Sequence, residues 1–121
     1  MDRAQAINAF WNSFGLRAYD ENTVPQNAVL PYITYEVATA SFEDGDVPLS
    51  ANVWYSGHTW AEITAKTDMI SDTIGFGGID VKTDTGYIWF KRRTPFAQRM
   101  SDPNENIRRM LLSISAEFFT T

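Results

Sequence analysis

The clearest alternation of apolar and polar residues lies between Leu30 and Val37 and predicts a strand over residues 31–38. Pro31 has no amide hydrogen, so it suits the first position of a strand and no central one. The residues after it alternate, which places one apolar set on a single face. That face carries Ile33, Tyr35 and Val37.

Further alternating segments predict two hairpins and a long last strand. Residues 49–55 follow a loop, 39–48, which holds three acidic residues and Gly45. Two strands around such a loop indicate a hairpin with a long tip, and we expect this tip to be mobile until it docks on a partner. Residues 79–82 and 87–91 flank a turn and predict the second hairpin. Segment 94–106 contains two prolines and is expected to be irregular, and residues 109–118 predict the last strand.

Two capping patterns predict two helices. Asp2 and Gln5 form a capping box before an apolar stripe that ends at Gly15. Thr59 and Glu62 have the same spacing and predict a second helix from Trp60 to the glycines at 75–78. Residues 17–29 between the first helix and the first strand are expected to form a polar connection. Trp11 and Phe14 are the expected core anchors of the first helix.

These elements predict one α+β domain over residues 1–121. Their order is helix, two strands, helix, two strands and one strand. We expect a mainly antiparallel sheet of about five strands with two helices packed on one face. In residues 87–91 both faces are apolar, which indicates cover on both sides or a contact between subunits.

The composition excludes several kinds of chemistry. The chain has no cysteine and one histidine, His58. Disulfides, thiolate zinc sites and cysteine nucleophiles are therefore excluded, and no carboxylates stand at metal-ligand spacing. The glycines at 75–78 follow a helix, whereas phosphate-binding loops precede one. We predict no catalytic residue, no cofactor site and no metal site.

The charge is divided unevenly along the chain. Residues 1–80 carry 11 acidic and 3 basic side chains, whereas residues 81–121 carry 7 basic and 4 acidic ones. Net charge is −5, which disfavours independent binding of nucleic acid. This uneven division is compatible with an ordinary surface on which acidic and basic residues are mixed. It is also compatible with copies that meet acidic patch to basic patch, as in a head-to-tail ring.

Nothing in the sequence predicts export or membrane insertion. The first residues lack the basic-then-apolar order of a signal peptide, and no run reaches the roughly 18 apolar residues of a membrane helix. We therefore expect a protein without membrane contact.

Several short motifs, taken in order, resemble one family of phage proteins. They are Phe14-Gly15-Leu16, the block at 30–35, Val53-Trp54-Tyr55, Trp89-Phe90-Lys91-Arg92 and the segment 94–102. The C-terminal strand around 112–118 follows them. Together they cover nearly the whole chain and resemble tail-terminator or tail-completion proteins, minor structural proteins of siphophages and prophages of Gram-positive hosts.

The resemblance implies a structural virion protein, present in the host cytoplasm only during assembly. It implies a ring, expected to be a homo-hexamer, that caps the tail tube, ends its polymerisation and joins tail to head. The implied partners are other copies of the chain, the major tail tube protein and a head completion or connector protein, with DNA passing through the lumen unbound. A neck protein, a tube subunit, and a non-phage binding module or small enzyme stay open as alternatives.

A ring requires an interface, and charge suggests its residues. We expect the basic run at 91–93 to meet the acidic loop at 43–46 of a neighbouring copy. The expected interface residues are Phe42, Glu43, Asp44, Asp46, Lys91, Arg92, Arg93 and Arg99.

Overall fold

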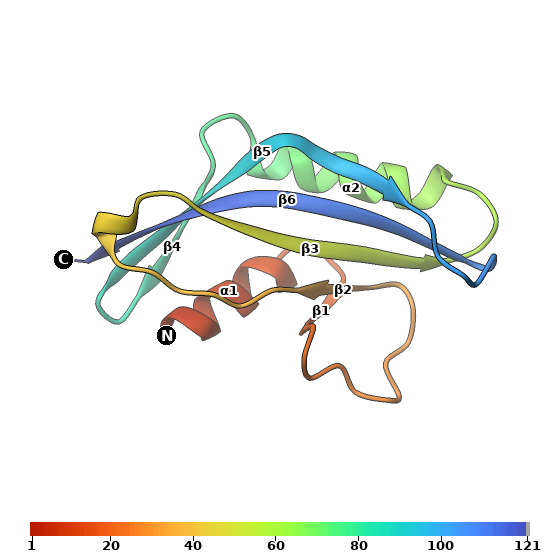
Figure 1. The fold of residues 1–121 in the computed structure, drawn as a ribbon, viewed down its shortest axis with the longest axis horizontal. Coiled ribbons are helices and arrows are strands. Elements are labelled where there is room, and N and C mark those ends of the chain that lie inside the picture. The colour runs from red at the N-terminus through yellow and green to blue at the C-terminus, as the bar shows by residue number, and fades with distance from the viewer. Residues whose placement is uncertain (121) are drawn as a thin grey trace.

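A computed structural model describes residues 1–120 and shows six strands in one sheet (Figure 1). The strand order is β1-β2-β3-β6-β5-β4, and only the β1–β2 pair is parallel. The elements are α1 (Arg3–Asn12), β1 (Arg17–Asp20), β2 (Tyr32–Tyr35), the 3₁₀ turn η1 (Phe42–Asp44), β3 (Val47–Ser56), α2 (Ala61–Ile74), β4 (Ile79–Thr83), β5 (Gly86–Met100) and β6 (Ile107–Thr120).

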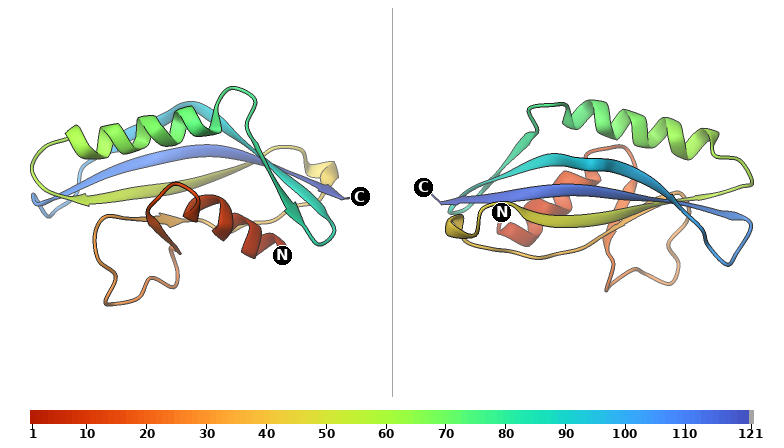
Figure 2. Two further views of the ribbon diagram at one scale, coloured as in Figure 1. Left: turned by 180° about the vertical axis from the view of Figure 1, so that it is seen from behind. Right: turned by 45° about the horizontal axis from the view of Figure 1, so that its top comes forward.

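Both helices cover the same face of the sheet, as the view from behind shows (Figure 2, left). No helix of the described residues covers the opposite face, which we call the open face. The predicted α+β class, with a mostly antiparallel sheet and both helices on one side, is confirmed. The two long central strands, β3 and β6, pair over ten residues each and form the middle of the sheet.

The core lies between the helices and the sheet. The ring of Phe10 in α1 stacks on that of Phe90 in β5, with centroids 4.0 Å apart and planes 15° from parallel. Trp11 and Phe14 are buried beside this pair, as predicted. α2 contributes its predicted stripe, which is buried at Ile63, Thr67, Ile70 and Ile74.

The sheet has one more strand than the sequence predicted. Residues 17–29 were expected to be a polar connection, but Arg17–Asp20 form β1, which pairs in parallel with β2. The side chain of Asn12 fixes this turn, because its amide oxygen accepts from the backbone N–H of Ala18 and its amide nitrogen donates to the Ala18 carbonyl. The predicted strand 31–38 is shorter, with only Tyr32–Tyr35 in the ladder.

The hairpin was predicted to end at residues 91–93 and residues 94–106 to be irregular. This was wrong for residues 94–100, whereas 101–106 lie outside any helix or strand, as predicted. β5 continues to Met100 and pairs with β6 on both sides of a register shift between Arg92 and Ala97. A bulge tolerates a proline because its residues do not donate to the ladder, and Pro95 lies within this one. The last strand is also longer than expected, at 14 residues.

The two capping boxes have different outcomes. The Asp2–Gln5 box is present, with the Gln5 N–H donating to Asp2 and the Asp2 N–H donating to Gln5. The helix ends at Asn12, before the expected Gly15. The prediction of a Thr59–Glu62 capping box was wrong. Trp60 occupies the N-cap of α2, and its side chain makes no capping hydrogen bond.

We expect Phe10→Ala to lower the free energy of unfolding by about 3–5 kcal/mol, because it empties the centre of the core. Urea denaturation measures this. Phe76→Ala is the matched control, since Phe76 is 99% exposed, and it should change stability by less than about 0.5 kcal/mol. Equal effects of the two substitutions would contradict the assigned core.

Candidate functional site

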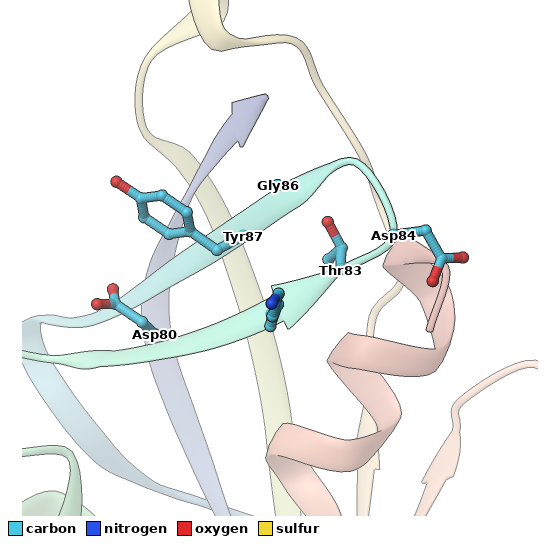
Figure 3. Close-up of a pocket in the computed structure, with 6 residues that line it drawn as sticks. Asp80, Thr83, Asp84, Gly86 and Tyr87 are labelled. Atoms are coloured by element: carbon cyan, nitrogen blue, oxygen red, sulfur yellow. The ribbon is translucent and has the colours of Figure 1, made fainter. Parts of the chain in front are cut away.

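A hollow of about 510 Å³ lies on the β4–β5 hairpin (Figure 3). Asp80 and Asp84 line it from different parts of the hairpin, and their carboxylates point away from each other. Asp84 accepts from the amino group of Met1 at 2.6 Å, and its N–H donates to the Met1 carbonyl. Asp84 therefore connects the tip of this hairpin to Met1. Tyr87 stacks on Phe119.

The described part of the chain has no group of side chains that could hold a metal ion. No three His, Asp or Glu side chains of residues 1–120 gather at metal-binding distance. His58 is exposed, and its backbone carbonyl accepts from Arg108 at 2.7 Å.

Lys91 is the centre of an ion-pair cluster on the open face. Its ammonium group lies 2.8 Å from Glu117 and 3.1 Å from Asp46, and 4.2 Å from the ring centre of Trp89. The hydrogen bond to Glu117 is the main cause that raises the pKa of Lys91, against the effect of burial. The structure thus joins the basic run and the acidic loop within one chain, at Lys91 and Asp46.

The other basic residues of the predicted interface lie apart from one another. Arg92 points to the helix side and donates to the Ser71 hydroxyl at 2.8 Å. Arg93 is exposed beside Phe76 at a second hollow. Arg99 lies near the far end of β5, where its guanidinium is 4.8 Å from the ring centre of Trp60. A contact of these residues with a neighbouring copy stays a prediction.

Two acidic residues of the predicted interface, Glu43 and Asp44, lie in the short 3₁₀ turn η1. Ser41 donates its hydroxyl to Glu43 at 2.7 Å and its N–H to Asp44 at 2.9 Å. These bonds lower the pKa of both carboxyls, so both are ionised at neutral pH. Phe42 is 60% exposed, and its ring centre lies 5.4 Å from that of Phe119.

Sequence reasoning missed a group of arginines stacked on tryptophans at the opposite end of the sheet. Arg99 and Arg108 both lie over Trp60, and Arg109 lies over Trp54 with its guanidinium carbon 5.2 Å from the ring centre. The Trp54–Arg109 pair had a detectable signal, since both residues fall on the polar faces of their predicted strands. The two residues are direct cross-strand neighbours.

A chain from the virion of a native gene transfer agent particle has the same fold. The TM-score is 0.59, and the match covers 93% of this chain and 94% of that chain at 22% sequence identity. No family model and no curated protein sequence matches this chain. Within residues 1–120, no helix has the length and apolar character needed to cross a bilayer.

We expect Lys91→Met to lower the free energy of unfolding by about 1 kcal/mol at pH 7, because two carboxylates lose their shared cation. Lys82→Met, which removes an exposed lysine on β4, is the control and should have almost no effect. Urea denaturation of both variants and of the unchanged protein measures the difference.

The Lys91 effect should also depend on pH. Burial is the largest influence on Asp46 and works to raise its pKa, but Lys91 and Arg93 hold it below the usual value. A lowered folded-state pKa means that the unfolded state binds more protons, so this stabilisation is lost as pH falls through and below about 4. Because the pKa of Lys91 is raised, the stabilisation by its ion pairs is kept until pH rises above about 10. A Lys91→Met effect that is unchanged at pH 3 would contradict this assignment.

Proposed function

We propose that this chain is a structural virion protein that forms a ring on the end of a phage tail tube, stops tube polymerisation and joins the tail to the head. The observation that carries the proposal is the shared fold with a gene transfer agent virion chain, which extends over nearly the full length of both chains. The motifs at 30–35, 53–55 and 94–102 support the narrower tail-terminator role.

The surface supports a role in assembly. The open face presents half-buried aromatic side chains instead of a second layer of structure. They are Tyr32, Trp54, Tyr87, Trp89 and Phe119. Aromatic side chains are enriched where proteins meet proteins, because they combine a large apolar surface with a rigid shape. Other copies of the chain, the tube protein and a head connector are the proposed partners, in the virion and in the host cytoplasm during assembly.

Deletion of the gene from the phage or prophage that encodes the chain tests this role. A missing terminator should give tails longer than normal that carry no head, as seen by negative-stain electron microscopy. Tails of normal length separated from filled heads would instead indicate a neck protein, and the absence of tubes would indicate a tube subunit. Unchanged, fully functional particles would refute the assembly role altogether.

We expect six copies of this chain per tail, the number that the resemblance to tail-terminator proteins implies, with each copy making the same contact with the next. Quantitative mass spectrometry of purified tails, scaled to the tube subunits in tails of known length, measures the copy number. A value clearly different from six would refute the hexamer.

A further inference from the structure

The two ends of the long axis, which lie near η1 and near the end of β3 in Figure 1, carry different kinds of side chain. The acidic turn, Ser41–Asp44, lies just before β3 begins, and Trp60 follows shortly after β3 ends. A strand of ten residues spans about 33 Å. The two features are therefore too far apart to touch within one chain.

The arginine–tryptophan end is formed by Trp54, Trp60, Arg99, Arg108 and Arg109. Arg99 and Arg108 share the helix side with Trp60, because their cross-strand partners Met110 and Tyr55 face the core, whereas Trp54 and Arg109 lie on the open face. In the described chain, none of its three arginines has a carboxylate within ion-pair distance. The Nε atoms of Arg108 and Arg109 are buried and have no hydrogen-bond partner.

Arg99 is the arginine most available to an anionic partner. Its side chain is exposed, and within residues 1–120 its guanidinium lies over Trp60 and makes no ion pair. Arg108, by contrast, donates to the backbone carbonyls of Glu105, Ile107 and His58. Asp102 and Glu105 are the nearby acids of the same hairpin loop, and Asp102 already accepts from the Asn104 N–H.

The acidic turn has complementary chemistry. Glu43 and Asp44 bond to Ser41, and neither pairs with a cation in the described chain. Phe42 precedes them, is 60% exposed, and has its ring centre 5.4 Å from that of Phe119 in β6. An exposed aromatic ring followed by two carboxylates fits Trp60 with Arg99 and Arg108 over its ring.

We propose that the acidic turn of one copy docks on the arginine–tryptophan end of the next copy and forms the repeating contact of the ring. Glu43 pairs with Arg99, and Phe42 packs beside Trp60. The inference rests on the proposed ring, and it replaces Lys91 as the main partner, since Lys91 is neutralised within its own chain by Asp46 and Glu117. Such a contact is heterologous and closes only as a ring or continues as a filament.

Charge reversal gives a sharp test. Arg99→Glu puts a carboxylate at the contact position of the arginine–tryptophan end, and Glu43→Arg puts a guanidinium at the contact position of the acidic turn. Each variant alone places like charges in every contact, which should lower the yield of functional particles at least about tenfold, since such contacts cost several kcal/mol. Both variants produced together in one cell can alternate around an even-numbered ring. Their co-production should therefore restore the yield, as should the double variant Arg99→Glu/Glu43→Arg.

Matched controls separate this contact from general charge effects. Lys82→Glu and Asp68→Arg reverse exposed charges elsewhere and should leave the yield unchanged. Normal yield from Arg99→Glu and from Glu43→Arg would overturn the proposed contact, while the gene-deletion phenotype would still report on the proposed function. Loss with Arg99→Glu that neither Glu43→Arg nor the double variant rescues would also overturn it, and would indicate an anionic partner other than this chain, such as DNA.

Discussion

Burial of only one face of the sheet is the constraint on which the rest of this structure depends. α1 and α2 pack on the same side, so every second residue of the central strands enters a core built around the Phe10–Phe90 stack. Because side chains alternate along a strand, the residues between them must lie on the face that no described helix covers. The core register therefore also fixes the open face, including Lys91 and its carboxylate partners.

The same register separates the charged groups along the long axis. β3 and β6 pair over their ten-residue overlap, and their length holds the acidic turn at one end and the stacked arginines at the other. An ion pair on the open face, by contrast, needs only neighbouring strands. Lys91 is thus neutralised within the chain, whereas Glu43, Asp44 and Arg99 form no ion pair within residues 1–120.

The likeness to the gene transfer agent virion chain shows how far two sequences can differ while they share a fold. At 22% identity the two chains still superpose over more than nine-tenths of their lengths. A layer of helices on a sheet needs apolar volume and correct alternation more than particular residues. The exposed residues are under no such constraint, so two chains with this fold can present different surfaces to their partners.

The sequence by itself determined the features that depend on neighbouring residues: the Asp2–Gln5 cap, the buried stripe of α2, the hairpin turn at 83–86 and the alternation of β3 and β6. Tertiary structure decided the rest. β1 is only four residues long and exists because β2 offers it a partner, and β5 passes Pro95 because β6 holds both sides of the bulge. The stacking of Arg99 and Arg108 on Trp60 joins residues about 40 or more positions apart, a contact that no local pattern encodes.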